Sequence, residues 1–529
     1  MTRRRILLGA LLVALFALGW SAGGGRASGS LYGNLDTFVE VLHAVQTSYV
    51  DPVQPKGLIE GGLRGMLRGL DPYSDYLDAR AYANYKASLD EDFSGVGVLL
   101  DLRDGYPVVV TPIDGSPAWE AGLLPGDVIL KVDGHATLGL SIPEVGTRLQ
   151  GEPGTRVTLQ IARTGDTAPR DVAIERARIA ARSVPYAFVA APGVGYLRLA
   201  RFGEHAGAEF AAALDTLRSG GARALVIDLR DDPGGLLDQA VAVSQQLLPE
   251  GTLVVSTRGR TATAAHRYVA GRARSEAAWP VAVLIDRGSA SAAEIVAGAL
   301  QDHDRALLLG QSTFGKGSVQ DVFPLRNDQG ALKLTTAIYV TPSGRTIRRA
   351  SPADDSADDG EDDAAPDSTP AAAAPAPEVF HTASGRVVHG GGIDPDVVVT
   401  PDSLPPAARA IADRRLAFRF AKRWLEQHGA GTTPAGDEAW SAFRADVAQQ
   451  GAAAAGELDA ERAVIAPMLE RELARRRSGP EAAARVALAT DPAFQRAAAV
   501  LRQARAPHDV FALATGGHPR AGGASRKVR

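Results

Sequence analysis

The chain has 529 residues, 45% of them hydrophobic and 22% charged, so it is long enough to form several soluble globular domains. Its net charge of −4 conceals a stretch, residues 351–377, with eight acidic and no basic residues. The rest of the chain has only a small positive charge and no basic stripe interleaved with aromatics, which excludes nucleic acid as an expected partner. The absence of cysteine excludes disulfides and thiol or cysteine–zinc chemistry.

The first 28 residues predict an export signal. Three arginines at 3–5 precede an apolar run over residues 6–22, which is followed by small residues that include Gly25 and Ala27. This order is typical of a signal peptide. The run is just short of the length that a membrane-spanning helix needs, so a cleaved signal peptide and a retained membrane anchor both remain open. In either case the arginines favour an N-terminus inside the cell and the rest of the chain outside.

Residues 30–90 predict an N-terminal helical region. Apolar residues recur at helical spacing over residues 35–50 and again from Leu58 to Leu70, after a break that contains prolines. We expect these helices to pack rather than to carry chemistry.

Residues 92–178 change to short strands and turns. Residues 95–100 and 107–111 predict strands, and residues 116–122 predict a short helix. Residues 121–127, which read Ala-Gly-Leu-Leu-Pro-Gly-Asp, predict a turn. Together these motifs resemble a PDZ domain over nearly its whole length; the alternative is a generic β-barrel turn. The resemblance implies a carboxylate-binding loop made of Gly95, Val96, Gly97 and Val98. Successive backbone N–H groups can hold an anion there, and an extended peptide can add to the adjacent sheet edge.

Residues 183–350 alternate short apolar strands with helices. Strands are predicted at 193–199, 222–228, 253–256, 281–285 and 306–309, and helices at 207–218, 236–248 and 291–301. This alternation predicts a largely parallel α/β sheet with right-handed crossovers. Active groups are then expected at the carboxyl ends of the strands.

Ser291 is the candidate nucleophile. It follows a buried strand and a turn, and it lies where a helix begins. The amide of Ala292 would point out of the helix N-terminus toward a developing oxyanion. Serine also commonly caps helices, and Ser289 is both the stronger candidate for the cap and the main rival as nucleophile.

Lys316 is the candidate base. The run from Gly310 to Lys316 looks like the start of a phosphate-binding P-loop, but Gly317 stands where Ser or Thr is needed and residues 319–323 predict a strand. A serine and a lysine that meet in space can form a nucleophile and its base without histidine. For that role the lysine must be partly desolvated, because burial lowers its pKa from about 10.4. A solvated surface lysine is the alternative.

A third motif, Asp228-Leu-Arg-Asp-Asp-Pro-Gly-Gly235, ends a buried strand in a tight turn. Amides of Gly234 and Gly235 can point into the cleft, and one of them is a candidate second oxyanion donor. A plain strand-to-helix turn is the alternative.

The PDZ-like region, the Pro-Gly-Gly turn and the Ser and Lys motifs occur in one order, which resembles the carboxy-terminal processing (tail-specific) serine proteases across residues 31–400. The resemblance implies a multidomain α/β fold. A PDZ domain (92–178) would be inserted between the N-terminal helical segment and an α/β ClpP/crotonase-like protease core at 183–350 and 378–402. It also implies Ser291 as nucleophile, Lys316 as general base, Gln320 as the residue that orients the lysine, and an oxyanion hole from Ala292 and the Gly234/Gly235 turn.

The remaining segments are assigned from composition. The acidic insert 351–377 is expected to be disordered, because it has no aliphatic residue larger than alanine. Residues 405–515 predict a C-terminal helical region, and residues 516–529 a basic flexible tail. One position departs from the family pattern: Asp232 stands where Asn is common.

These features predict an exported endopeptidase of the periplasm or cell envelope, either free or anchored to the inner membrane. Its expected partners are protein or peptide substrates with free C-termini, and neither a metal nor another cofactor is expected. A catalytically silent PDZ-bearing adaptor is the alternative, and a hydrolase based on His266 or His303 is a third hypothesis. Homodimerisation stays open.

Overall fold

The computed structural model describes residues 28–516, except residues 350–377 and shorter gaps at 72, 90–91, 104, 114–115, 125, 141, 164–167, 181, 273–277, 327–329, 401–402 and 429–435. The predicted signal or anchor, the acidic insert and the basic tail therefore lie outside the described residues, apart from Ser28 and Gly516. Within the described ranges, no helix combines the length and apolar character needed to cross a bilayer.

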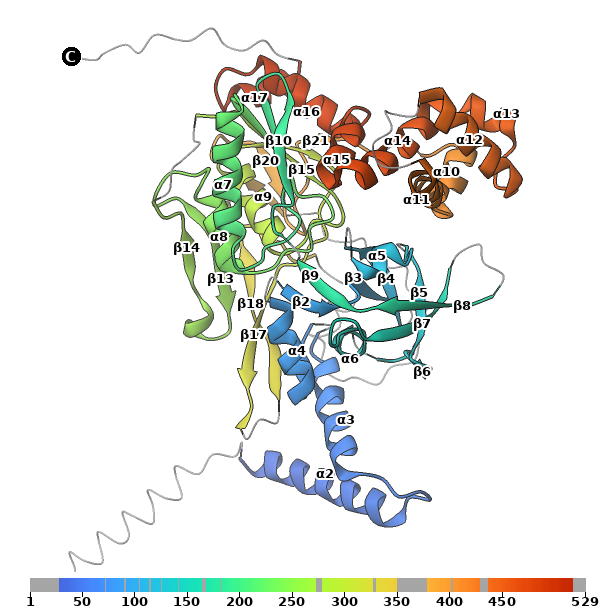
Figure 1. The fold of residues 1–529 in the computed structure, drawn as a ribbon. Helices are drawn as coiled ribbons and strands as arrows, with labels where there is room; N and C mark the ends of the chain where they lie inside the picture. Colours follow the sequence, from blue (N-terminus) through green and yellow to red (C-terminus); the bar gives the residue numbers. More distant parts are fainter. Residues whose placement is uncertain are drawn as a thin grey trace, which may run out of the picture. The chain divides into compact units, whose positions relative to one another are not determined.

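The chain divides into two compact units, one up to Tyr76 and one from Leu77 onward. The first contains α2 (Ser28–Ser48) and α3 (Pro55–Arg68), with Pro55 at the first helical position of α3, where its missing N–H costs nothing (Figure 1). A short strand, β1 (Asp75–Leu77), spans the division, and α4 (Ala79–Leu89) follows. The helices predicted for residues 30–90 are thus present.

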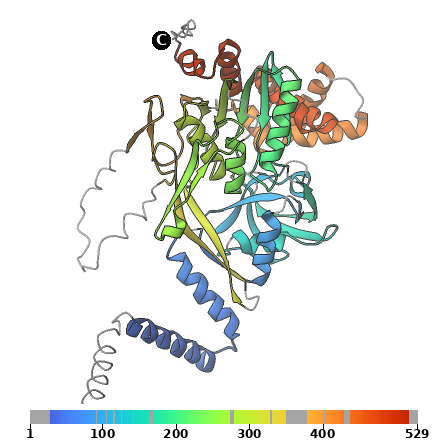
Figure 2. The ribbon, with the colours of Figure 1, turned by 90° about the vertical axis from the view of Figure 1, so that its left-hand side faces the viewer.

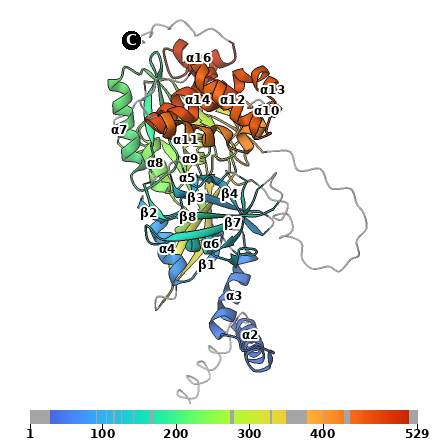
Figure 3. The same cartoon turned by 45° about the vertical axis from the view of Figure 1, so that its right-hand side comes forward.

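Residues 92–180 form a small β-domain. Its main sheet has the order β3 (Val98–Arg103), β4 (Tyr106–Pro112), β5 (Val128–Val132), β7 (Arg156–Ala162), β8 (Arg170–Glu175), with β6 (His135–Ala136) beside β5. A separate pair joins β2 (Asp92–Gly95) to β9 (Ala177–Ala180). Two helices, α5 (Pro117–Glu120) and α6 (Ile142–Leu149), complete the domain (Figure 3). Its core is aliphatic, with Ile129 and Leu159 fully buried. Strand β3 is the last strand of its sheet, so one of its edges is open.

The α/β domain is built on a six-stranded sheet. Its order is β10 (Tyr186–Ala191), β11 (Val194–Arg198), β12 (Ala224–Asp228), β15 (Val281–Ile285), β16 (Leu307–Gly310), β21 (Val397–Val398). Only β10 runs antiparallel to its neighbour. The predicted parallel α/β sheet is therefore confirmed.

Helices cover both faces of this sheet. On one face Ile227 and Val283 pack with α7 (Ala206–Ser219), α8 (Leu237–Ser244) and α9 (Ala292–Asp302). On the other face Val226 and Leu284 pack with α15 (Pro480–Leu488), α16 (Pro492–Gln503) and α17 (Asp509–Ala514). Burial on both faces explains why these strands are continuous apolar runs. The last helices of the chain are thus one layer of the α/β domain, which the sequence did not indicate.

A second sheet is antiparallel. Strand β13 (Leu253–Gly259) pairs with β14 (Arg267–Val269) and with β18 (Ala331–Val340), and β18 pairs with β17 (Ser318–Pro324). Figure 2 shows β17 and β18 as a long yellow hairpin. The strand predicted at residues 253–256 therefore belongs here and not to the parallel sheet, because its edges pair with β14 and β18. A short hairpin, β19 (Val379–His381) with β20 (Val387–His389), follows the acidic insert.

The five helices that follow β21 in the sequence and precede α15 form a separate cluster. These are α10 (Pro406–Asp413), α11 (Leu416–His428), α12 (Gly436–Gln449), α13 (Ala455–Ala460) and α14 (Arg462–Ser478). Phe420, Trp440 and Phe443 are central to their shared core. The helical character predicted for residues 405–515 is present.

We expect Phe494→Ala to lower the free energy of unfolding by about 3–5 kcal/mol. Phe494 is 3% exposed, and its ring meets that of Tyr196 edge-on with centroids 5.8 Å apart. Chemical denaturation followed by circular dichroism measures the loss. The control is Arg502→Ala, at an exposed position of the same helix, for which a change within about 0.5 kcal/mol is expected. Equal stability of both variants would contradict the packing of α16 on the sheet.

Candidate active site

The candidate site lies where three neighbouring parallel strands end. Strand β12 leads into the turn that contains Gly234, β15 into the turn that contains Ser291, and β16 into the loop that contains Lys316. Carboxyl ends of parallel strands lie at one edge of a sheet. The sheet therefore brings these three predicted residues to the same edge.

Ser291 stands at the N-cap position of α9 with φ 54° and ψ −114°. A non-glycine residue in this region costs about 1–3 kcal/mol, and such strain occurs mainly at functional sites. A strained strand-to-helix turn of this kind presents a nucleophilic hydroxyl in other hydrolases.

Ser289 is not the helix cap, so this prediction was wrong. Its side chain is fully buried, and its hydroxyl donates to the carbonyl of Leu229 over 2.8 Å and accepts from the N–H of Asp286 over 3.0 Å. Ser289 thus fixes the turn before α9 to the turn after β12, and its committed hydroxyl makes it a poor rival for the nucleophile.

One buried carboxylate, Glu294, connects the turn that contains Ser291 to the loop that contains Lys316. Its Oε2 accepts the backbone N–H of Ser291 (2.8 Å) and of Lys316 (2.9 Å). Its Oε1 accepts the N–H of Gly315 (2.8 Å) and the hydroxyl of Thr313 (2.5 Å). The backbone nitrogens of Ser291 and Lys316 are therefore less than two hydrogen-bond lengths apart.

Sequence reasoning missed Glu294. The available signal was its spacing, because Ser291 and Glu294 have the three-residue separation of a capping box. Glu294 accepts the N–H of the N-cap residue, Ser291, as in a capping box. It also accepts hydrogen bonds from the backbone N–H groups of Gly315 and Lys316 in the neighbouring loop.

Burial sets the protonation behaviour of both groups. Burial raises the pKa of the Glu294 carboxyl, and the hydrogen bonds from Thr313, Ser291, Gly315 and Lys316 oppose that rise. Burial also lowers the pKa of the Lys316 ammonium, and the positive charge of Lys333 lowers it further, while Glu294 acts in the opposite direction. The net decrease increases the neutral, basic fraction of Lys316 at a given pH.

Gly234 lies against Ser291. A Cβ at this position would approach Ser291 Cβ to 2.9 Å and Ala292 N to 2.8 Å, and its φ is +90°. Only glycine fits such a contact with such a backbone. The N–H of Gly234, however, donates to Asp232 Oδ1 over 2.8 Å. In the described part of the chain, the amides of Gly235 and Ala292 have no acceptor, so these two are available to an oxyanion.

Gln320 lies on β17, beside a break in the β17–β18 register. Its amide nitrogen donates to Ser318 Oγ over 2.8 Å and to Thr335 Oγ1 over 3.4 Å. The orientation of Lys316 by Gln320 stays a prediction.

The predicted carboxylate loop connects β2 to the open-edged strand β3. Gly97 has φ +74°, and its carbonyl accepts the hydroxyl of Ser116 over 2.8 Å and the N–H of Ile113 over 2.9 Å. The buried Val96 accepts the N–H of Ala118 over 2.7 Å. Gly95 ends β2 and Val98 begins β3. These contacts fix the loop's shape, and peptide binding by it stays a prediction.

The two histidines of the third hypothesis make contacts with backbone carbonyls. His303 is the C-cap of α9 and thus at the opposite end of that helix, where its Nε2 contacts the carbonyl of Leu253 over 2.7 Å. His266 Nε2 contacts the carbonyl of Thr263 over 2.8 Å. The described residues contain no cluster of His, Cys, Asp and Glu that could hold a metal ion.

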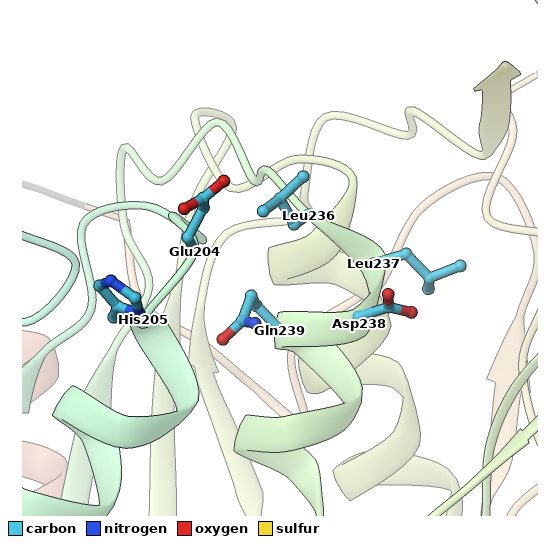
Figure 4. Close-up of a pocket in the computed structure, with 6 residues that line it drawn as sticks. All are labelled: Glu204, His205, Leu236, Leu237, Asp238 and Gln239. Atoms are coloured by element: carbon cyan, nitrogen blue, oxygen red, sulfur yellow. The ribbon is translucent and has the colours of Figure 1, made fainter. Parts of the chain in front are cut away.

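An open pocket of about 420 Å³ is lined in part by residues 236–239, which directly follow Gly235 in the sequence (Figure 4). Its lining combines two leucines with polar side chains: Glu204, His205, Leu236, Leu237, Asp238 and Gln239. The β-bridge between Phe202 and Gly235 holds its two loops together. Sequence reasoning missed this pocket, because its loops are adjacent only in the folded sheet.

We expect Glu294→Gln to reduce kcat at least about 100-fold, because small displacements of reacting groups have effects of this size. An amide replaces one carboxylate oxygen with a donor, and in either orientation that donor would oppose at least one backbone N–H group. Steady-state peptide hydrolysis measures the loss. Glu250→Gln, at an exposed position, is the matched control and should leave kcat unchanged. Full activity of Glu294→Gln would show that the carboxylate does not organise the site.

Comparisons with known proteins agree with this architecture. Residues 193–355 match the model of peptidase family S41, residues 108–163 match the PDZ domain, and residues 24–81 match the N-terminal domain of the activating protease CtpB. A solved photosystem II D1 C-terminal processing protease is 29% identical, with a TM-score of 0.49; the match covers 70% of this chain and 93% of that one.

Two curated relatives are similar over most of their length. A carboxy-terminal-processing protease of Bartonella bacilliformis is 42% identical over 321 residues, which are 60% of this chain and 73% of the relative. The carboxy-terminal processing protease CtpA of Bacillus subtilis is 31% identical over 339 residues, 64% of this chain and 72% of the relative. The chain therefore belongs to the carboxy-terminal processing proteases of peptidase family S41, which are serine peptidases, and it carries a PDZ domain.

Proposed function

We propose that this peptidase cleaves exported proteins near their C-termini, with Ser291 as nucleophile and Lys316 as general base. The observation that carries the proposal is the Glu294 carboxylate, which accepts the backbone N–H of both residues. The strained backbone of Ser291 and the lowered pKa of Lys316 support the same roles.

The reaction follows from these positions. Neutral Lys316 takes the proton of the Ser291 hydroxyl as Oγ attacks the carbonyl carbon of the scissile bond. The amides of Gly235 and Ala292 stabilise the oxyanion of the tetrahedral intermediate. The lysine ammonium then protonates the leaving amine, and an acyl-enzyme on Ser291 remains. Water, deprotonated by neutral Lys316, attacks the ester, and Ser291 recovers its proton as the carboxylic product leaves.

The PDZ domain provides the recognition of the substrate end in this proposal. The Gly95–Val98 loop would bind the terminal carboxylate, and the substrate strand would pair with the open edge of β3, beside α6. Cleavage then occurs upstream of a captured C-terminus. A catalytically silent adaptor would need neither the strained serine nor the buried lysine.

The location and assembly of the protein also belong to the proposal. An N-terminal export signal would place the protein in the periplasm or cell envelope. Fractionation of cells that express the full chain determines whether the N-terminal segment anchors the protein in the membrane. A homodimer is supported by α2, which exposes Leu35, Phe38, Val39 and Val41. A second copy would bury such side chains, and light scattering measures the resulting mass.

We expect Ser291→Ala and Lys316→Arg each to reduce kcat at least about 1,000-fold. Arginine keeps the positive charge but cannot be deprotonated, so it separates a base from a merely cationic group. In the wild type the rate should rise with pH through the pKa of Lys316, because only the neutral amine accepts a proton. Hydrolysis of an internally quenched peptide measures both effects. Lys131→Ala, at an exposed position of the PDZ domain, serves as the control. Activity that survives both site variants would refute the Ser–Lys assignment.

We expect a substrate whose C-terminus is amidated to show a KM about tenfold or more above that of the free acid, with kcat little changed. The reason is that the amide removes the charge that the loop N–H groups would bind. A pair of peptides identical except at the terminus provides the comparison. Equal KM values would mean that the loop does not select the carboxylate.

A further inference from the structure

A second buried acid, Asp232, lies in the turn that supplies Gly235. Its side chain is fully buried. Oδ1 accepts the N–H of Gly234 over 2.8 Å, whereas Oδ2 has no hydrogen-bond partner among the described residues. A buried carboxylate normally has its oxygens satisfied, because an unpaired charge is costly to bury. An ionised carboxyl is therefore costlier at this position than a neutral one.

The backbone of Asp232 also joins the two halves of the site. Its N–H donates to the carbonyl of Leu229 over 3.2 Å, and its carbonyl accepts the N–H of Ala290 over 2.9 Å. Ala290 immediately precedes the nucleophile. An ionised Asp232 would therefore place its charge in the turn that contains Gly235 and next to the turn that contains Ser291.

The charges around Asp232 come from every element packed against it. Arg198 on β11, Arg201 after it and Asp228 at the end of β12 act on Asp232 itself. Arg230 in the same turn and Asp286 in the turn after β15 act on the adjacent acid, Asp231. Asp228 engages both Arg198 and Arg230, so these cations are already paired. Burial, with a smaller contribution from the negative charge of Asp228, raises the pKa of Asp232 to about 8 against the opposing effects of the Gly234 N–H, Arg198 and Arg201.

We propose that Asp232 is a positioning residue that supports the oxyanion turn only while its carboxyl is protonated. The inference rests on the proposed Ser–Lys function. When the carboxyl ionises, a negative charge with little solvent around it lies beside the turn that must stabilise a second negative charge on the oxyanion. The two like charges repel each other, and the repulsion exists only once the oxyanion forms. The effect therefore falls on kcat rather than on KM.

The two titrating groups act on opposite sides of the pH profile. The rate rises with pH as Lys316 becomes neutral, and it falls with pH as Asp232 ionises. The wild type should therefore have a bell-shaped profile, and its alkaline limb falls about tenfold per pH unit. Asparagine has the same shape as aspartate, keeps the acceptor for Gly234 and cannot ionise.

The test compares the pH profiles of kcat for wild type, Asp232→Asn and the control Asp215→Asn, an exposed acid on α7 of the same domain. Asp232→Asn should lose the alkaline limb, keep the acid limb of Lys316 and leave KM unchanged. The control should keep both limbs. An alkaline limb that survives in Asp232→Asn overturns the proposal, as does a uniform loss of rate at all pH values, which a merely structural role would produce.

Thermal unfolding supplies a readout that does not depend on cleavage. Because the folded state raises the pKa of Asp232, the unfolded state ionises first and wild-type stability decreases as pH rises from the ordinary carboxyl range to about 8. The midpoint advantage of Asp232→Asn over wild type should therefore grow between pH 5 and pH 9. A difference in unfolding midpoint that stays constant between pH 5 and pH 9 would show that the Asp232 carboxyl is not neutral in the folded protein. A wild type that cleaves no peptide at any pH, even though the stability difference grows with pH, overturns the proposed function and, with it, the positioning role of Asp232.

Discussion

The site depends on a carboxylate that accepts four hydrogen bonds inside the protein. Glu294 projects from the first turn of α9, where the helix dipole favours a negative charge. Hydrogen bonds to a charged group each contribute about 1.5–3 kcal/mol, so four of them offset much of the cost of burial. Thr313, one of the four donors, also accepts the N–H of Ile393 over 2.8 Å. The segment that follows the acidic insert is thereby tied to the same centre.

The rest of the fold makes that arrangement rigid. The three turns of the site follow directly after neighbouring strands of the parallel sheet. Helices cover both faces of these strands, so a turn cannot move without disturbing a packed core. Arg230, in the oxyanion turn, pairs with Asp228 over 2.6 Å and with Asp491 over 2.7 Å. Asp491 is the N-cap of α16 and accepts from Ala493 and Phe494. The C-terminal helices therefore hold the turn that follows β12 as well as covering the sheet.

Local signals in the sequence predicted most elements but not their partners. Continuous apolar runs identified four strands of the parallel sheet, β11, β12, β15 and β16, but not its two outer strands, β10 and β21. Glycine and proline marked the ends of the predicted strands. The strand at residues 253–256 has the same composition as its neighbours, and only its pairing with β18 puts it in the second sheet. The Ser and Lys motifs were found because each is local. Glu294 was missed because its role depends on a loop more than twenty residues away, and the Gly234 amide was over-interpreted because its acceptor is decided by the turn geometry.

Two acids that are close in sequence have pKa values shifted in opposite directions, because their surroundings differ. Asp228 and Asp232 are four residues apart, yet paired arginines lower the pKa of Asp228, whereas burial without a full set of partners raises that of Asp232. The same logic applies to the base. Glu294 directs its oxygens to backbone N–H groups of the lysine loop, and its charge raises the pKa of Lys316 less than burial and Lys333 lower it. One buried carboxylate can thus hold the loop of a lysine in place and still leave its amine basic enough, and neutral enough, to act.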